Sequence, residues 1–378
     1  MQEIGHEVVV IEATDHVGGR LLSETLSDGT VVELGGEWIT TDQTHVTALA
    51  NDLGLSLIPT GSDFSMRDLG IDSPLSAAEH NRVAAIVAAA IAGLTVAEMA
   101  GKTAKDLLDG VDDGSEAMTA LRLRIEGSAA LNLARVGASE LVGDFGVASA
   151  AYVRIEGGNQ RLAIEAAKRL SNIRFMSPVT AIHTRDSFVE LRTASTAIQA
   201  DGVVIAVPLP LLRSITFDPP LPEPTTEAIS RLQMGIASKI AAATATDPPL
   251  LARQHPSEPW WYWTALGGDG FPRRVVTAFG GTDASATKQA DSWFSELATL
   301  VDDTRLTGES VHKSWGTDEW TRGCYTALGP GDEELLAAFE AVDRFVFAGE
   351  HTGGWGSIDG AVLSGHEAAE RLNRFLSM

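Results

Sequence analysis

Two apolar runs near the opposite ends of the chain constrain its fold most. His6 to Glu12 (HEVVVIE) is a continuous β-branched run, which is typical of a strand buried on both faces of a parallel sheet. Phe345 to Ala348 reads in the same way, and a glycine-rich turn then leads to a final helix, expected from about Ala361 to Leu376. Because strands of one sheet would come from both ends of the chain, we predict a discontinuous domain with a second domain inserted into it.

The segments between these runs predict an α/β fold. Helices are expected near residues 44–53 and over most of 73–141, where Thr95 to Glu98 has the capping-box pattern of a helix start. Short strands are expected between residues 173 and 207. A second, mixed sheet is expected from later strands around Lys239, Trp261, Val275 and His312.

The two predicted domains divide the chain as follows. A Rossmann-like nucleotide-binding domain would comprise residues 1–58, 150–212 and 328–378. An inserted α+β substrate domain would comprise residues 59–149 and 213–327.

Charge and cysteine content narrow the classes of function. The chain has 51 acidic and 28 basic residues, a net charge of −23, which argues against nucleic acid or an anionic membrane surface as a partner. Solubility is the commoner reason for such acidity, and attraction of cationic substrates such as amines is the alternative. Cys324 is the single cysteine, so a disulfide within the chain and a cysteine-rich zinc site are excluded, and we predict no metal site.

The single cysteine and the apolar segments together predict a cytoplasmic protein. The longest apolar run, residues 84–94, is too short to span a bilayer, and the first residues lack the pattern of a secretory signal. We therefore expect no membrane span.

Both ends of the predicted nucleotide domain carry residues suited to a dinucleotide. Glu12 ends the first strand, where an acidic residue of a doubly wound fold accepts hydrogen bonds from a ribose, although a solvated turn residue is the commoner role of such a glutamate. The segment from Ser357 to Ala361 opens the last helix, whose free amides can hold polar or anionic cofactor groups. The phosphate-binding pattern G-x-G-x-x-G is absent from the sequence.

Three spaced motifs in one order give the chain a family resemblance. Gly5 to Ala13, Val17 to Arg20 and Glu33 to Trp38 resemble the start of the flavin monoamine oxidase family and its polyamine oxidase relatives, without the first strand, the phosphate loop and most of the first helix. Phe347 to Thr352 with Ser357 to Ala361 resembles the last flavin-contacting motif of that family. The resemblance implies an FAD-binding, Rossmann-like domain of the GR2 type.

The resemblance also implies which residues hold FAD. Glu12 would bind the adenosine ribose, Arg20 would lie by the phosphates, and the backbone of Val179 would contact the adenine. The glycines would let the backbone approach the cofactor closely. The full expected set is Glu12, Gly18, Gly19, Arg20, Gly35, Gly36, Glu37, Trp38, Val179, Cys324, Gly349, Glu350, Ser357, Ile358, Asp359 and Ala361.

Three further residues match the catalytic positions of the family. Lys239 would hold a water at flavin N5, although a lysine at the end of an apolar strand is more often a surface residue. Trp315 would pack beside the isoalloxazine, and Tyr325 would form one wall of a cage that orients the amine. The second aromatic wall of the family is replaced by Ser357 and Ile358, with nearby Trp355 as a candidate substitute.

Two positions leave alternatives open. Cys324 stands where the mitochondrial monoamine oxidases attach flavin through a thioether, but a buried free thiol is the commoner fate of a lone cysteine, so we favour non-covalent FAD. The aromatic run from Trp260 to Trp263 could line a substrate pocket, and core packing is the favoured interpretation.

The resemblance implies an FAD-dependent oxidase of amines. A hydride equivalent would pass from the substrate C–H next to nitrogen to flavin N5, O₂ would become H₂O₂, and the imine would hydrolyse. One alternative is a non-catalytic or cofactor-poor member, because the phosphate loop is missing. The same loss would expose the flank of the first strand and allow a homodimer contact. The other is a flavin dehydrogenase or desaturase of a non-amine.

Overall fold

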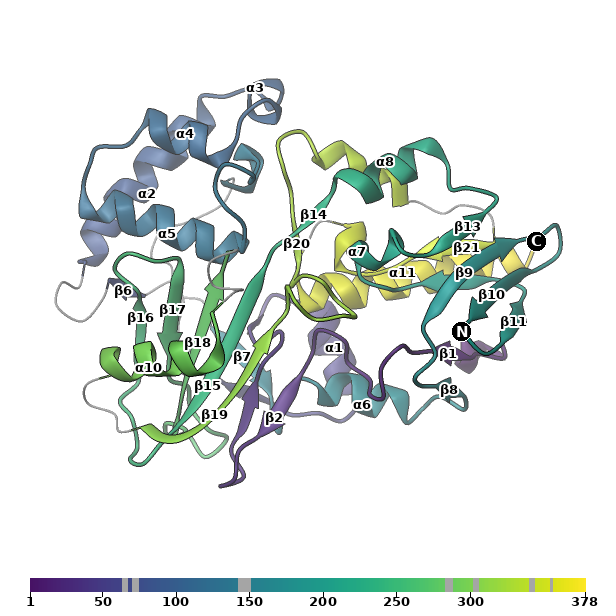
Figure 1. Cartoon of the computed structure of the whole chain (residues 1–378), viewed down its shortest axis with the longest axis horizontal. Coiled ribbons are helices and arrows are strands. Elements are labelled where there is room, and N and C mark those ends of the chain that lie inside the picture. Colours follow the sequence, from purple (N-terminus) through teal and green to yellow (C-terminus); the bar gives the residue numbers. More distant parts are fainter. Residues whose placement is uncertain are drawn as a thin grey trace.

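A six-stranded sheet forms one side of the protein, drawn on the left of Figure 1. The computed structural model describes residues 1–62, 67–69, 75–141, 151–282, 288–301, 306–339, 344–353 and 356–378. The strand order is β19 (Leu306–Ser314), β15 (Ala237–Thr244), β18 (Val275–Gly281), β17 (Trp260–Trp263), β16 (Ala252–Gln254) and β6 (Asp68–Leu69). Only β6 and β16 pair in parallel, so the predicted mixed sheet is confirmed.

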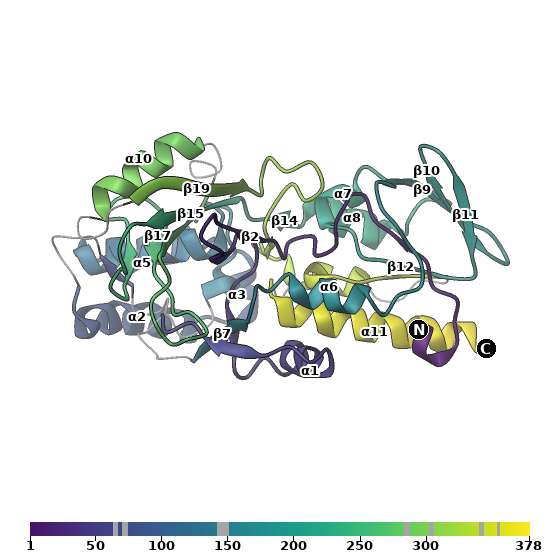
Figure 2. The ribbon, with the colours of Figure 1, turned by 90° about the horizontal axis from the view of Figure 1, so that it is seen from below.

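Helices cover both faces of this sheet (Figure 2). Helix α10 (Ala290–Leu300) packs on one face and α5 (Glu116–Ala129) on the other. Successive side chains of a strand point to opposite faces. Accordingly, Trp260 and Tyr262 join the core under Trp293 of α10, which confirms core packing for these two residues of the aromatic run.

The helical segment after the first sixty residues packs beside the large sheet (Figure 1). It contains α2 (Ala77–Ala92), α3 (Val96–Ala100), α4 (Ala104–Gly110), α5 and the 3₁₀ turn η3 (Ala138–Leu141). The predicted capping box at Thr95 and Glu98 is present, with reciprocal bonds between the Thr95 side chain, the Glu98 side chain and the two backbone N–H groups. A core that includes Val87, Leu108 and Leu121 holds these helices together.

The other side of the protein carries the pieces from the two ends of the chain. Strand β1 (Val10–Ile11) pairs in parallel with β8 (Ile173–Arg174), and β12 (Val203–Ile205) pairs in parallel with β21 (Phe345–Phe347). A separate four-stranded sheet has the order β11 (Ala197–Ala200), β10 (Val189–Thr193), β9 (Val179–Thr184) and β13 (Thr216–Asp218). The short helices of this region are α6 (Arg161–Ala167), α7 (Leu209–Leu212) and α8 (Glu223–Arg231), with 3₁₀ turns η4 (Glu333–Phe339) and η5 (Glu350–Thr352).

Smaller sheets connect the two sides. Strands β2 (Ser23–Thr25) and β3 (Val31–Glu33) form a hairpin, and β14 (Gln233–Met234) pairs with β20 (Thr326–Ala327). Strand β7 (Tyr152–Ile155) lies between β4 (Ile39–Thr40) and β5 (Leu57–Pro59).

The last helix begins earlier than expected. Helix α11 (Ile358–Leu376) starts at Ile358 rather than near Ala361 because the Ser357 hydroxyl accepts a hydrogen bond from the Gly360 N–H and caps the helix there. It packs against α1 (Thr44–Asp52) and β21.

The first strand also differs from the sequence-based expectation. Instead of one long buried strand, β1 has two residues, and Val8 to Ile11 are half-buried. In the described part of the chain β1 pairs only with β8 and β21 only with β12, so the parallel strands form two separate pairs. Strand pairing alone does not decide this burial, since β21 also has one partner and is fully buried where α11 packs against it.

The N-terminal residues instead reach the end of the chain. The turn η1 (Gln2–Ile4) ends at Gly5 in a left-handed conformation, and His6 Nε2 lies 2.8 Å from Asn373 Oδ1 of α11. The two termini therefore lie close together (Figure 2).

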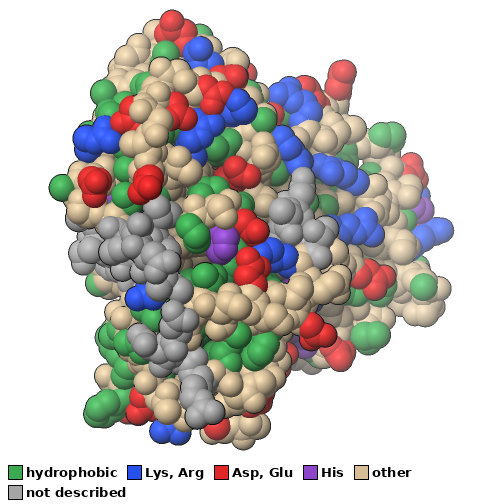
Figure 3. All heavy atoms as spheres, turned by 60° about the vertical axis from the view of Figure 1, so that its left-hand side comes forward, with side chains coloured by type: hydrophobic (Ala, Val, Ile, Leu, Met, Phe, Trp, Pro, Cys, Tyr) green, Lys and Arg blue, Asp and Glu red, His purple; other side chains and the backbone are tan. Residues whose placement is uncertain are grey.

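The protein surface mixes both signs of charge over the face that carries the helical segment. Figure 3 shows Asp and Glu side chains interspersed with Lys and Arg there rather than one patch of a single sign. Among the described residues, no helix is both long and apolar enough to cross a bilayer.

Candidate active site

The backbone from Leu34 to Glu37, directly after β3, is held from several sides. The Trp315 indole N–H donates to Leu34 O at 2.8 Å, and the Asn159 side-chain amide donates to Gly36 O and Glu37 O at 3.0 and 2.9 Å. A Cβ atom at Gly35 would stand 2.1 Å from Arg20 O, so only glycine fits this close crossing of two chain segments. The glycine pair thus lets two predicted cofactor segments touch.

Lys239 of β15 reaches this backbone from the large sheet. Its Nζ donates to Glu37 Oε2 at 2.6 Å and to Gly35 O at 3.2 Å. Both side chains are almost completely buried, with 4% and 1% of their surfaces exposed. The interpretation of Lys239 as a surface residue is therefore wrong, because its ammonium is paired inside the protein.

Further charged groups surround Glu37. Arg273 Nη2 lies 3.7 Å from Glu37 Oε1. Burial acts to raise the pKa of Glu37, but the positive charges of Lys239 and Arg273 outweigh it and lower the pKa. Burial and the Glu37 charge raise the pKa of Glu33. Arg273 has no recognisable signal in the sequence, so this cluster was found only in the structure.

A second ion pair joins the start of the chain to its end. Arg20 Nη1 donates to Glu350 Oε1 at 2.6 Å and to Cys324 O at 3.0 Å. The other Glu350 oxygen accepts the Thr326 N–H at 3.0 Å. Burial acts to raise the pKa of Glu350, and Arg20 outweighs it, so the pKa is lowered. The predicted residues Arg20, Cys324 and Glu350 therefore meet at one point.

The start of α11 lies against the same backbone. Ile358 Cδ1 would be 3.3 Å from a Cβ atom built on Gly36, and the Asp359 carboxylate accepts the Val46 N–H of α1 at 2.8 Å. Ala361 N–H bonds to Ser357 O, inside the first turn. Upstream, the Gly349 N–H donates to the Ser364 hydroxyl at 3.0 Å.

Glu12 lies farther along the same side of the fold. One carboxylate oxygen accepts the N–H and hydroxyl of Thr14 at 2.8 and 2.9 Å, and Glu12 O accepts the Ser177 N–H at 2.8 Å. Ser177 lies two residues before Val179, where β9 begins, so this last bond brings Glu12 close to the start of β9. Gly18 and Gly19 have φ values of +121° and +54°, which favour glycine at this turn.

Tyr325 and Cys324 adjoin Arg20 through its hydrogen bond to Cys324 O. The Tyr325 hydroxyl donates to Ser128 O at 2.6 Å. Desolvation raises the pKa of the Cys324 thiol to about 12, although part of the residue is exposed. At neutral pH this thiol is protonated.

Trp38 belongs to an aromatic cluster that the sequence did not reveal. It makes ring contacts with Tyr152, Trp261 and Trp263, with centroids 5.4 to 5.8 Å apart. Lys239 Nζ lies 5.2 Å from the Trp263 ring, so the cluster borders the Lys239–Glu37 pair. Trp355, the candidate second cage wall, lies outside the described residues.

The donor set fits a flavin dinucleotide. An acidic side chain with an oxygen beyond the Thr14 contacts suits ribose hydroxyls, and the first amides of α11 suit polar ring atoms. Two cations also belong to this region: Arg20, which bonds to Glu350, and Lys239, which bonds to Gly35 O. Parallel strands, an acidic residue after the first of them and a helix N-terminus are the elements typical of dinucleotide-binding folds.

Comparison with known proteins gives the family. The family of flavin containing amine oxidoreductases matches residues 1–154 and 148–373, so the chain belongs to this family. It is 25% identical to putrescine oxidase of Kocuria rosea over 97% of this chain and 90% of that protein. It is 26% identical to polyamine oxidase 3 of Oryza sativa subsp. japonica, over 98% of this chain and 85% of that protein.

Solved structures agree with the fold. Wild-type putrescine oxidase bound to putrescine superposes with a TM-score of 0.81 at 22% identity, covering 99% of this chain and 95% of that one. Cyclohexylamine oxidase of Brevibacterium oxydans gives a TM-score of 0.81 at 19% identity, covering 100% and 95%. The predicted mixed α/β fold is thus the fold of these amine oxidases.

Proposed function

We propose that this protein binds FAD without a covalent link and oxidises a small amine with O₂. The amine would lose two electrons and two protons to give an imine, O₂ would take them up as H₂O₂, and water would hydrolyse the imine to a carbonyl compound and an amine or ammonia. Bound flavin would supply the acceptor for the hydride and the route to O₂. Family membership supports this reaction class.

One observation carries the proposal. Trp315 and Lys239 both bond to the backbone between Leu34 and Glu37. The same backbone contacts the N-terminus of α11. Contact of Trp315 and Lys239, two of the three predicted catalytic residues, with the predicted cofactor segment supports the proposal.

The chain's own residues would divide the work. Glu12 would hold the ribose, Arg20 would sit near the anionic part of the cofactor, and the α11 amides would hold the flavin ring. Tyr325 would offer its ring to the substrate amine, while its hydroxyl is anchored on Ser128 O. Lys239 would keep a proton close to the reacting edge of the ring.

The high pKa of Cys324 supports non-covalent binding. A thioether requires attack by a thiolate, and the desolvated thiol is protonated at neutral pH. Arg20, which bonds to Glu350, would be the main cation near the cofactor phosphates.

The test is a visible spectrum of the purified protein, before and after acid precipitation, with added FAD as a second condition. Flavin absorbance in the supernatant, together with peroxide release from an amine panel, is the expected result. A protein that neither carries nor takes up FAD would overturn the proposal and favour a non-catalytic member. Flavin that is bleached only by non-amine substrates would favour the dehydrogenase alternative.

A further inference from the structure

Five charged side chains form a buried cluster behind the candidate site. They are Glu33, Glu37, Arg154, Lys239 and Arg273, and none is more than 9% exposed. Burying a charge is costly unless it is paired, so each member depends on its neighbours. The cluster contains two carboxylates and three cations.

The contact between Glu37 and Lys239 is the closest in this cluster. Lys239 Nζ lies 2.6 Å from Glu37 Oε2 and 3.2 Å from Gly35 O. Both acceptors belong to residues of the segment from Leu34 to Glu37, which lies against α11. The Glu37 carboxylate and the Gly35 carbonyl together orient the Lys239 ammonium. Without its carboxylate, a buried ammonium would lose its proton more easily, because desolvation disfavours the charged form.

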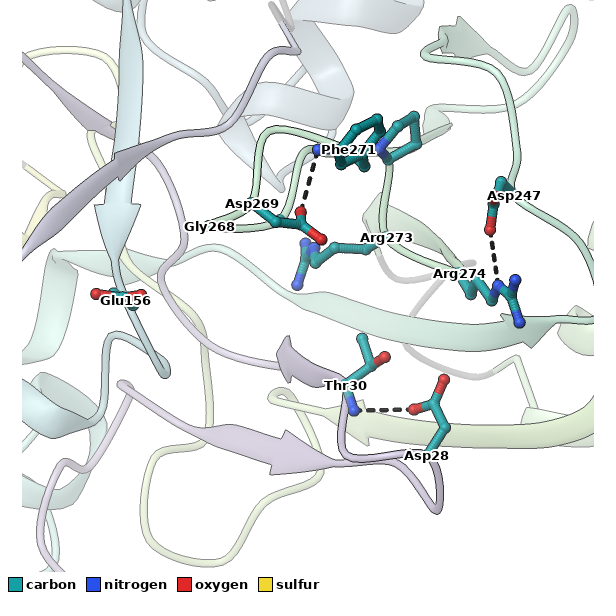
Figure 4. Close-up of a pocket in the computed structure, with 11 residues that line it drawn as sticks. Asp28, Thr30, Glu156, Asp247, Gly268, Asp269, Phe271, Arg273 and Arg274 are labelled. Carbon is teal, nitrogen blue, oxygen red and sulfur yellow. Dashed lines mark hydrogen bonds and ion pairs between the residues drawn. The ribbon is translucent and has the colours of Figure 1, made fainter.

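Arg273 faces the other carboxylate oxygen of Glu37, Oε1. Its Nη2 is 3.7 Å from Glu37 Oε1, and its Nη1 donates to Val31 O at 2.5 Å. It also lines a cavity of about 620 Å³ whose other walls include Asp28, Glu156 and Asp269 (Figure 4). Arg273 therefore separates the buried pair from this polar cavity.

Arg274 provides a natural comparison. It lines the same cavity, but it bonds to Asp247, and both side chains are more than half exposed (Figure 4). The two adjacent arginines therefore differ in burial and in partners, and of the two it is Arg273 that contacts Glu37.

We propose that Glu37 is a positioning residue for Lys239, which fixes the ammonium and its proton at the cofactor segment, with Arg273 as the second cation that holds Glu37. This inference rests on the proposed function. Glu37 acts through Lys239 and not on the substrate. A neutral side chain at Glu37 would leave Lys239 buried with the Gly35 carbonyl as its remaining acceptor.

The test is a double-variant cycle with Glu37→Gln, Lys239→Met and both together, in the FAD-bound protein. The rate of reoxidation of reduced flavin by O₂ is measured between about pH 6 and pH 10. We expect a flat profile for wild type. For Glu37→Gln we expect a rate that falls on the order of tenfold as pH rises, because a buried ammonium that has lost its carboxylate partner holds its proton less firmly. In the Lys239→Met background, Glu37→Gln should add no pH dependence.

A second readout does not depend on turnover. The reduction potential of the bound flavin should shift upward in Glu37→Gln at low pH, where a negative charge has been removed, and downward in Lys239→Met. Arg273→Gln keeps the Glu37 carboxylate beside Lys239, so its profile should stay flatter than that of Glu37→Gln, and Arg274→Gln should leave the profile unchanged. Glu33→Gln is the matched carboxylate control, since Glu33 bonds to Ser23 and to the Asn159 N–H, and its profile should stay flat.

The outcomes separate this inference from the proposed function. A protein without flavin overturns both. A flavin-bound Glu37→Gln variant with a flat profile, or one whose pH dependence persists without Lys239, overturns the inference alone. If Glu37→Gln does not fold, Glu37→Asp replaces it. The retained charge should then preserve the flat profile at a lower rate, and a pH-dependent rate in that variant would contradict the inference.

Discussion

Arg20 Nη1 and Glu350 Oε1 lie 2.6 Å apart, although 330 positions separate the two residues in the sequence. Glu350 is 5% exposed and also accepts the Thr326 N–H. This pair holds the first glycine turn, the strand after Tyr325 and the end of β21 together. The geometry of the candidate cofactor site therefore depends on one contact between the two ends of the chain.

Arg20→Ala should destabilise the protein and weaken FAD binding. Removal of one partner leaves a buried carboxylate uncompensated, which costs about 3 kcal/mol. Urea unfolding, with and without FAD, measures both effects. Arg374→Ala is the control, since Arg374 and Glu370 are 4.0 Å apart and 69% and 74% exposed, and its loss should change stability by less than about 0.5 kcal/mol. Equal stability losses in the two variants would contradict the prediction.

Asn159→Ala should be one of the most damaging single changes near the site. Asn159 is fully buried, donates to Gly36 O and Glu37 O, and accepts the Ile155 N–H at 2.8 Å. The variant leaves these buried backbone groups unpaired, and we expect a loss of roughly 3 kcal/mol in the free energy of unfolding. Asn159→Asp keeps the acceptor for Ile155 but turns a buried carboxylate oxygen toward Gly36 O and Glu37 O, so it should be more destabilising than Asn159→Ala. Denaturant unfolding that shows Asp and Ala to be equivalent would argue against this account.

The stability of the protein should fall between neutral pH and pH 4, in part because of His351. Burial lowers the pKa of His351 from 6.5 to about 4, with Glu350 opposing and Arg20 assisting the shift. The unfolded chain binds a proton below about pH 6.5 while the folded chain does not, so stability is complete above that pH and decreases as pH falls. The difference corresponds to about 3 kcal/mol at pH 4.

His351→Leu should flatten this pH dependence. Leucine cannot titrate and fills the same buried site beside Phe339. Unfolding free energies measured at several pH values test the effect. The remaining decrease below about pH 4.5 belongs to carboxylates whose pKa is lowered in the fold, Glu350 and Glu37 among them, because their contributions disappear as pH falls. A slope that is the same in wild type and variant would exclude His351 as its source.

Cys324 should react slowly with alkylating reagents in the folded protein. Its pKa of about 12 leaves little thiolate at neutral pH, and the thiolate is the reactive form. Modification by iodoacetamide, followed by mass spectrometry, should be slow in native protein and fast after denaturation. Cys324→Ser should keep the same amount of FAD as wild type. Loss of flavin from that variant would instead indicate a covalent link.

The local features of the fold could be read from the sequence. The short strands expected between residues 173 and 207 are present as β8 to β12, and the Thr95 capping box marked the start of α3. The order of the glycine motifs predicted the family, which the comparisons confirm. These properties follow from backbone propensity and from residues close together in the chain.

The tertiary structure decided which groups are paired. The sequence contains Lys239 and Glu37 as two residues 202 positions apart, and nothing in its pattern indicates that one neutralises the other. The half-buried β1 was equally unpredictable, because burial depends on which elements of the folded chain pack against a strand. Ion pairs, pKa shifts and strand burial depend on distances that exist only in the folded chain, and for this reason the sequence determined the family and the local elements, while the fold determined the electrostatics of the site.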